Sequence, residues 1–183
     1  MGWREMHTKA VSAARGLDRW LPDIARLVFA CVLLLYFWRS AWTKLGEGVS
    51  GWWTPSAGAY AQIFPRAFEA AGYDAAQMSV FHTAVALAGT WGELVLPLLI
   101  VLGLWTRLAA LGMLVFVAVQ SWVDVVGHGG GAQVLGGWFD GDSAALVADQ
   151  RALWVVLLLV LVARGGGVCA VDGVWARWRP VRP

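Results

Sequence analysis

Charged residues are scarce in this sequence. Asp, Glu, Lys and Arg make up 14% of its 183 residues, whereas an ordinary soluble domain contains about a quarter. This scarcity excludes a typical soluble enzyme. Together with 59% hydrophobic residues and a mean hydropathy of +0.62, it predicts a protein that contacts lipid. The formal net charge of +2 is small and its basic residues are dispersed, which also excludes a nucleic-acid-binding protein.

Cysteine and the common catalytic motifs are equally rare. Cys31 and Cys169 do not belong to a Cys-x-x-Cys motif, so neither a disulfide nor a thiolate-bound metal is expected. The sequence has no phosphate-binding loop, no dinucleotide-binding glycine motif ahead of a strand, no zinc-protease motif and no nucleophile elbow. His128, Asp140 and Asp142 match no standard ligand spacing, and we predict no metal site.

Long apolar runs are what the sequence does contain. A helix needs about 20 mostly apolar residues to cross the hydrocarbon core of a bilayer. Four windows meet this requirement, at approximately 22–43, 78–105, 107–126 and 144–163. The link between the second and third windows is too short for anything but a tight turn, so these two helices should be antiparallel neighbours. We therefore predict an all-α bundle of four transmembrane helices, forming a single membrane domain over residues 1–183.

The segments that flank these windows predict two further features. Apolar residues recur at helical spacing between Trp3 and Trp20, with basic residues on the other faces, which is typical of an amphipathic helix at the membrane interface. The first apolar segment is not followed by a small-x-small cleavage site, so it should be retained as an anchor. Residues 46–77 form a long loop that we expect to cover the outer end of the bundle.

The positions of Lys and Arg predict the orientation of the chain. If the amino terminus is cytoplasmic, ten of the 14 basic residues lie on the cytoplasmic side. The other side then holds only Arg39, Lys44, Arg66 and Arg151. Because cytoplasmic loops are enriched in Lys and Arg, this distribution favours both termini inside.

Glu93 is the first candidate for a functional residue. It lies near the middle of the second window, in a stretch that has no other Asp, Glu, Lys or Arg from Ala75 to Thr106. An acid at that depth must be protonated, paired or directed into a polar cavity. Pro97, four residues later, cannot donate to the Glu93 carbonyl and should leave an extra acceptor there. Glu93 either manages a proton in catalysis or stabilises the bundle through a hydrogen bond.

His82 is the second catalytic candidate. Eleven residues separate His82 from Glu93, which is close to three helical turns, so both project from one face of the helix. Ala86 and Gly89 lie between them and leave room for a slot that runs from the outer surface to the membrane centre. His82 would relay protons there, unless it is an interfacial histidine that is hydrated.

A polar level near the outer surface predicts a binding site or an ion pair. Counting the helical rise places Arg39, His82, Gln120 and Asp124 at similar depths, with Lys44 nearby. The simplest use of this arrangement is an ion pair between Arg39 and Asp124. The alternative is a substrate or quinone-headgroup site at Gln120 and Asp124, to which Arg39 and Lys44 attract an anionic molecule.

The segment from Gly92 to Leu111, GELVLPLLIVLGLWTRLAAL, resembles the signature of the DoxX family. Arg26–Leu45 resembles the first helix of that family, and Ala67–Gly72 resembles the end of its outer loop. The resemblance implies a four-helix protein of a bacterial-type inner membrane with an oxidoreductase-linked role, since the family takes its name from a subunit of a thiosulfate:quinone oxidoreductase. The matching polar positions are Glu93, Arg107, Arg26 and Lys44. We interpret Arg26, Pro97 and Arg107 as structural.

These features lead to two hypotheses on function, which belong to different classes. The first is a small membrane subunit of a redox system that holds a quinone or another lipid-soluble reductant near His82 and Glu93 and acts with a protein partner. The second is a non-catalytic scaffold or assembly factor. Transport of a small solute would need a homo-oligomer, because four helices leave little room for a pathway and show no inverted repeat.

Overall fold

The computed structural model describes residues 2–178 of the chain, apart from the side chains of 9–15 and 176–178. Within these residues the regular structure is helical, and the only β-type pairing is an isolated bridge between Leu45 and Pro55. Four helices in this part of the chain are long and apolar enough to cross a membrane: Gly16–Trp42, Val80–Leu102, Thr106–Gly127 and Leu146–Arg164. The predicted all-α bundle with four membrane-spanning helices is confirmed.

The four spans are built from the longer helical elements. The first combines α1 (Trp3–Phe29), a π-helical turn η1 (Ala30–Leu34) and α2 (Leu35–Trp42). The second is α5 (Val80–Leu102), and the third is α6 (Thr106–Trp122) with the π-helical turn η4 (Val123–Gly127). The fourth begins with η5 (Leu146–Arg151) and continues as α8 (Ala152–Arg164).

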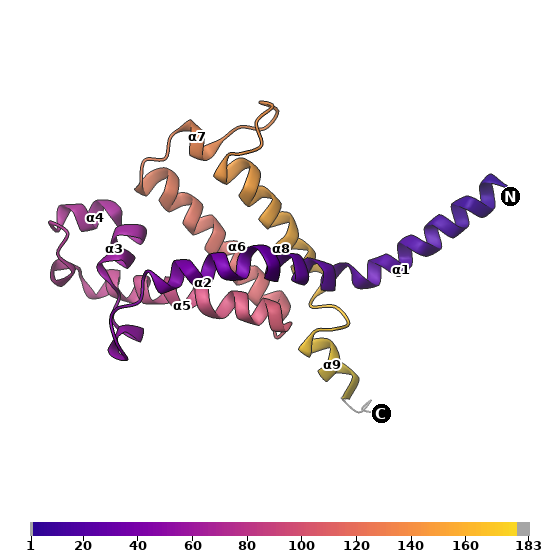
Figure 1. Ribbon diagram of the computed structural model, residues 1–183, viewed down its shortest axis with the longest axis horizontal. Coiled ribbons are helices and arrows are strands. Elements are labelled where there is room, and N and C mark those ends of the chain that lie inside the picture. Colours follow the sequence, from indigo (N-terminus) through magenta and orange to yellow (C-terminus); the bar gives the residue numbers. More distant parts are fainter. Residues whose placement is uncertain (1, 179–183) are drawn as a thin grey trace.

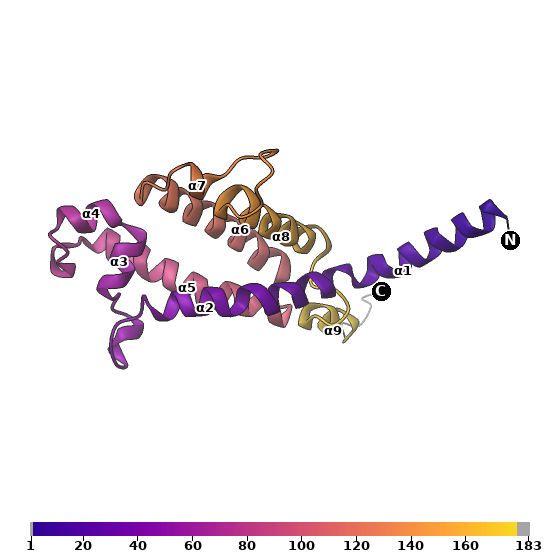
Figure 2. The same ribbon diagram turned by 45° about the horizontal axis from the view of Figure 1, so that its top comes forward.

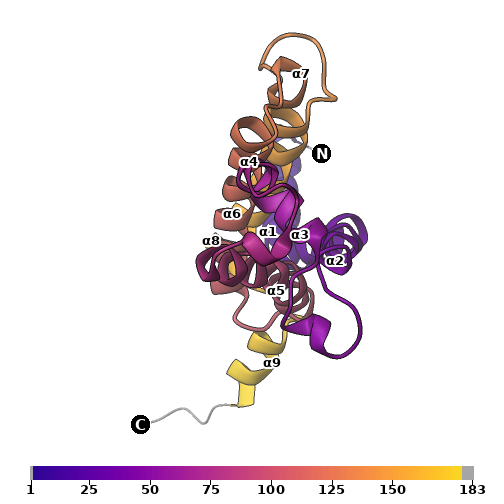
Figure 3. The same cartoon turned by 90° about the vertical axis from the view of Figure 1, so that its left-hand side faces the viewer.

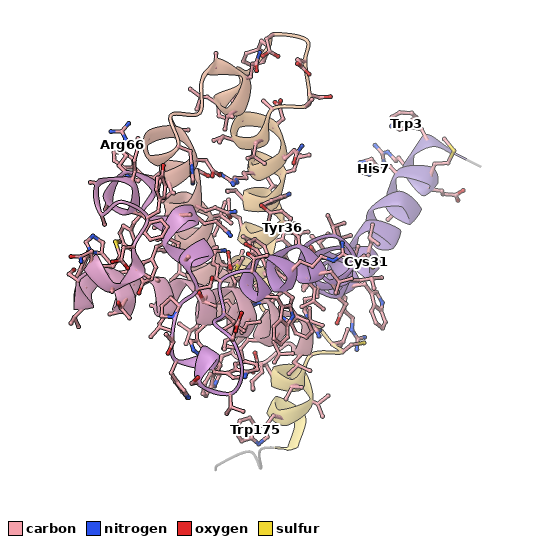
Figure 4. All side chains as sticks on the ribbon, turned by 60° about the vertical axis from the view of Figure 1, so that its left-hand side comes forward. Trp3, His7, Cys31, Tyr36, Arg66 and Trp175 are labelled. Atoms are coloured by element: carbon pink, nitrogen blue, oxygen red, sulfur yellow. The ribbon has the colours of Figure 1, made fainter. Side chains whose placement is uncertain are left out.

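The predicted amphipathic segment is not a separate helix. It forms the beginning of α1, which runs through Pro22 into the first span without a break. Figure 1 shows this part of α1 projecting beyond the other helices, and Figure 4 shows Trp3 and His7 near its tip. The side chains of 9–15, which contribute to the predicted amphipathic face, and the basic residues Arg179 and Arg182 lie outside the described residues. Contact of this segment with a membrane surface stays a prediction.

The spans pack as one connected bundle, in which α6 contacts both α8 and α5, α5 also contacts α2, and α1 contacts α8. Figures 1 and 2 both show α5 and α6 close together at their connecting turn and further apart towards α3 and α7. We call the end with the connecting turn the α9 end and the opposite end the α3 end. Large side chains from all four spans fill the centre of the bundle, and those with almost no exposed surface are Phe29, Phe37, Ile100, Met113, Leu158 and Leu161.

The connection between α5 and α6 depends on a glycine. Gly103 ends α5 in the left-handed conformation, with φ of 72°, and the chain reverses so that the two helices are antiparallel neighbours. A Cβ atom at this position would lie 2.5 Å from the Ala170 Cβ and 2.8 Å from the Arg26 Cζ. Glycine is therefore required both for the backbone conformation and for the close approach of the neighbouring segments.

Arg26 joins three segments at the α9 end. Its Nε donates to the Ile100 carbonyl at 3.0 Å and its Nη2 to the Val101 carbonyl at 2.5 Å, both in the last turn of α5. Its Nη1 donates to the Gly166 carbonyl at 2.9 Å, in the loop after α8. Carbonyls in the last turn of a helix lack intrahelical donors, so Arg26 acts as a side-chain cap for α5. This contact geometry supports the structural interpretation of Arg26.

Two aspartates complete the α9 end. Asp23 accepts hydrogen bonds from the backbone N–H groups of Val168 and Cys169, each at 2.9 Å. Asp172, at the start of α9 (Val171–Trp178), accepts from the N–H groups of Trp105 and Thr106 at 2.9 Å and from the Thr106 hydroxyl at 3.1 Å. The bonds to Asp172 satisfy backbone donors at the beginning of α6. An acidic side chain is favourable at this position because the helix dipole is positive there.

The hydrogen bonds to Asp172 predict a dependence of stability on pH. Partial burial raises the pKa of this carboxyl, but the bonds from Thr106 and Trp105, with a smaller contribution from the Arg26 charge, lower it below its ordinary value of 3.8. A lowered folded-state pKa means that the contribution to stability is present above pH 3.8 and is lost as the pH falls through the folded value. We expect the thermal stability of Asp172→Asn to fall less between pH 5 and pH 3 than that of the unmodified protein. Equal losses in a melting series would contradict this expectation.

The long loop between the first two spans folds over the α3 end of α5. It contains η2 (Ser50–Trp52), α3 (Ala57–Ile63), α4 (Pro65–Ala70) and η3 (Ala75–Gln77). Ser56 caps α3 by accepting from the Ala59 N–H at 3.2 Å, and Tyr60 and Phe68 are buried against Ala86 of α5. Figure 3 shows α3 and α4 from this end, and Figure 4 places Arg66 here and Trp175 at the opposite end. The short α7 (Ala132–Leu135) lies in the glycine-rich loop before η5.

Candidate functional site

A buried ion pair between Lys44 and Glu93 lies in the half of the bundle towards the α3 end. The Lys44 Nζ is 2.7 Å from both carboxylate oxygens of Glu93, and the two side chains are only 6% and 3% exposed. The Ser40 hydroxyl accepts from the Lys44 Nζ at 2.6 Å and donates to the Glu93 Oε1 at 3.1 Å. All three protons of the ammonium group therefore have acceptors, as a charge so far from water requires.

Local sequence spacing explains how this pair is positioned. Ser40 and Lys44 are four residues apart, so they lie on the same face at the end of the first span, which also buries Phe37 and Ala41. That face lies against α5, where Glu93 is buried one turn before Pro97. The Trp38 indole N–H donates to the Leu94 carbonyl at 3.2 Å and holds α2 and α5 together beside the ion pair.

A cavity of about 410 Å³ lies next to the ion pair, where α5 and α6 diverge. Its walls are mainly apolar, and small residues of α5 and α6 leave the space: Ala88, Gly89, Gly92 and Gly112. Gln62 and Ile63 of α3 cover one side, so the loop contributes to the cavity. Its further lining residues are Ser40, Lys44, Val85, Glu93, Leu96, Val115, Phe116, Val119, Gln120, Val123, Asp124 and His128.

Gln120 supplies an unsatisfied acceptor in this cavity. Its Nε2 donates to the Tyr36 hydroxyl at 3.1 Å, while its Oε1 is buried and has no hydrogen-bond partner among the described residues. His128 also lines the cavity, and its Nε2 is 3.0 Å from the Gln62 carbonyl, so this nitrogen carries the proton. The cavity thus combines apolar walls with a few polar groups, the usual composition of a small-molecule site.

The predicted ion pair between Arg39 and Asp124 is wrong. Asp124 pairs instead with Arg151, whose Nη2 lies 2.5 Å from the Asp124 Oδ2 and whose Nη1 donates to the Ser121 hydroxyl at 3.0 Å. Arg151 is 3% exposed, whereas Arg39 is exposed and lines a separate shallow depression on α2. Helical rise gives the depth of a residue but not the direction of its side chain, and only Arg151 is directed towards α6.

The structure does not bring His82 to Glu93. The His82 Nδ1 is 2.8 Å from the Ser79 hydroxyl, and the ring contacts Phe64 and Phe81 near the beginning of α5. The part of the predicted slot near His82 is covered, because α3 and α4 pack over Ala86, while its part at Gly89 belongs to the cavity beside Glu93. The loop packing therefore separates His82 from the cavity.

The other predicted residues are distributed as follows. Gln120 and Asp124 both line the cavity, as does Lys44, which is paired with Glu93 rather than exposed. Pro97 is buried in α5, and Arg107 is exposed at the α9 end. Sequence reasoning missed His128 as a cavity residue and Arg151 as the partner of Asp124. The i, i+4 spacing of Ser40 and Lys44 already placed these two polar groups together.

The described residues contain no group of three or more His, Cys, Asp and Glu side chains arranged to hold a metal ion. A family model described as DoxX matches residues 21–129. The chain belongs to the DoxX family. Every residue that lines the cavity lies within the DoxX match, whereas Arg151 of η5 and the whole of α8 lie outside it. The search of curated proteins and the search of solved structures each returned no match.

Proposed function

We propose that this DoxX protein is a small membrane subunit of a redox system, which holds a quinone or another lipid-soluble reductant in the cavity and acts with a protein partner. The observation that carries this proposal is the cavity of about 410 Å³ between α5 and α6, with a buried acid–base pair at its wall. The proposal places the protein in a bacterial-type inner membrane with both termini in the cytoplasm, consistent with the distribution of Lys and Arg along the chain.

The residues present fit such a ligand. The volume lies within the range of small-molecule sites, and apolar walls between lipid-facing helices suit a molecule that arrives from the bilayer. The Gln120 Oε1, which has no partner among the described residues, would accept a hydrogen bond from a hydroxyl group of the ligand, such as that of a reduced quinone. A bound quinone would supply two-electron chemistry coupled to proton transfer. The chain's part is to exclude water, to orient the polar group and to provide a protonatable carboxyl at Glu93.

The contacts divide the work between the polar residues. Lys44 and Ser40 hold the Glu93 carboxyl at the cavity wall and bind both of its oxygens. Because every Lys44 proton has an acceptor, Lys44 acts on the ligand through Glu93. Arg39 is exposed on α2, where its charge would attract an anionic molecule. His82 lies outside the cavity and takes no part in this proposal.

Filling the cavity tests the proposal. Ala88 lines it, and Ala84 is an exposed alanine one turn earlier on α5 that does not. We expect Ala88→Phe to weaken binding of a short-chain quinone at least about tenfold, because the ring would occupy the space of a ligand ring. Ala84→Phe is the matched control and should bind as the unmodified protein does. Quenching of tryptophan fluorescence in mild detergent measures both, and equal affinity in the two variants would reject the cavity as the ligand site.

A non-catalytic scaffold or assembly factor is the second candidate, and the complete pairing of Lys44 favours it. An ion pair with no open position stabilises helix packing without needing a ligand. Under this alternative the partner protein or a second copy of the chain would bind the helix surfaces. Ala88→Phe would then leave partner recovery unchanged, and no quinone would bind to any variant.

A further inference from the structure

A second and larger cavity lies at the α9 end, about 810 Å³ in volume and open to the outside. It is formed where the middle of α1, the start of α6, the end of α8 and the beginning of α9 converge (Figures 1 and 2). Three arginines from three different helices line it: Arg19, Arg107 and Arg164. The redox proposal does not use this cavity.

The acidic groups in this cavity are already occupied. Asp18 is bound by the two terminal nitrogens of Arg164, at 2.8 and 2.7 Å. Both oxygens of Asp172 accept hydrogen bonds from the beginning of α6. Arg19 and Arg107 are exposed, and neither forms an ion pair or a side-chain hydrogen bond within the described residues. Two guanidinium groups therefore remain available for an anion, and guanidinium groups bind phosphate oxygens well.

The depth of the cavity points to a lipid as the source of that anion. Thr106 begins the third span and Arg164 ends the fourth, so the cavity lies at the level of the lipid headgroups. Trp105, 63% exposed, lies at the same level, where tryptophan is enriched in membrane proteins. From the cavity, α6 continues with an exposed apolar strip formed by Leu108, Leu111 and Val115. A headgroup bound by the arginines would leave its acyl chains along this strip.

We infer that the cavity between α1, α6, α8 and α9 is a binding site for the phosphate of an anionic phospholipid, held by Arg19 and Arg107. Basic pockets between transmembrane helices recognise such headgroups through charge and hydrogen bonding. Arg164 forms part of the cavity wall and stays paired with Asp18. This site is independent of the proposed redox function.

Binding of defined lipids to the purified full-length protein tests the inference. Native mass spectrometry in a neutral detergent would compare the affinity of the protein for phosphatidylglycerol with its affinity for phosphatidylcholine. Inorganic phosphate and glycerol phosphate would be added as soluble competitors. We expect preferential binding of phosphatidylglycerol, weakened about thirtyfold in Arg19→Gln/Arg107→Gln, since each basic residue near the membrane surface contributes about fivefold. Arg4→Gln/Arg66→Gln removes the same charge far from the cavity and should bind as the unmodified protein does.

Three other results would contradict either the cavity as the binding site or the lipid as the source of the anion. Equal losses in the two double variants would mean that total charge, not this cavity, attracts the lipid. Competition by inorganic phosphate or glycerol phosphate at equal affinity would overturn the lipid as the source of the anion. If the double variant has a lower melting temperature in neutral detergent, lipid binding is compared in the single variants Arg19→Gln and Arg107→Gln instead. Each single variant is expected to bind phosphatidylglycerol about fivefold more weakly. Unchanged binding in both single variants would overturn the site.

Discussion

Replacing Lys44 with methionine is expected to destabilise the protein by about 3–5 kcal/mol, the usual effect of removing one partner of a buried ion pair. The Glu93 carboxylate is 3% exposed and receives its hydrogen bonds from Lys44 and Ser40. Without the ammonium group, it must either stay charged in an apolar interior or take up a proton. Thermal unfolding in mild detergent would show this as a large fall in melting temperature.

A second substitution separates charge pairing from packing. Lys44→Met combined with Glu93→Leu removes both charges and keeps side chains of similar volume, so most of the stability should return. The single variant Glu93→Gln also removes one charge of the pair and leaves the Lys44 ammonium buried without a counter-charge, so it should lose about as much as Lys44→Met. If the double variant were no more stable than Lys44→Met, the ion pair would not be the cause of the loss.

Arg26→Gln is expected to cost about 3–5 kcal/mol, because it removes three hydrogen bonds from a charged donor to carbonyl groups. Ile100 and Val101 would lose their cap at the end of α5, and the loop at Gly166 would lose its attachment. Arg26→Lys keeps the charge but cannot reach three carbonyls in the same geometry, so an intermediate loss is expected.

Hydrogen exchange locates this effect in the chain. Faster exchange should appear at residues 165–175 and in the last turn of α5, with α2 and its contacts at Glu93 unchanged. Arg107→Gln is the matched control, because Arg107 lies at the same end of the bundle but is exposed. Equal stability of the Arg26 and Arg107 variants would refute the capping role of Arg26.

Glu93 illustrates how far a sequence argument reaches. Its isolation within an apolar window required a partner or a polar cavity, and the structure shows a partner, Lys44, beside a mainly apolar cavity. The identity of the partner did not follow, because Lys44 lies 49 residues earlier beyond the end of α2. Two helices must pack at one particular rotation before these side chains meet, and hydropathy carries no information on that rotation.

His82 shows the opposite outcome. Helical spacing correctly places it on the same side of α5 as Glu93, but the spacing says nothing about what covers that side. The loop helices α3 and α4 pack there, with Tyr60 and Phe68 buried against Ala86. A loop of mixed composition has no strong periodicity, so its packing on α5 was beyond sequence reasoning.

The sequence by itself determined the helical class, the four spans and the position of an acid deep in the membrane. These features depend on local composition and on the length of apolar runs, which the bilayer thickness converts directly into helices. Only the tertiary structure decided that Lys44 pairs with Glu93, that Arg151 pairs with Asp124, and that a cavity opens between α5 and α6. Those results depend on the rotation and divergence of packed helices, which residues far apart in the chain set together.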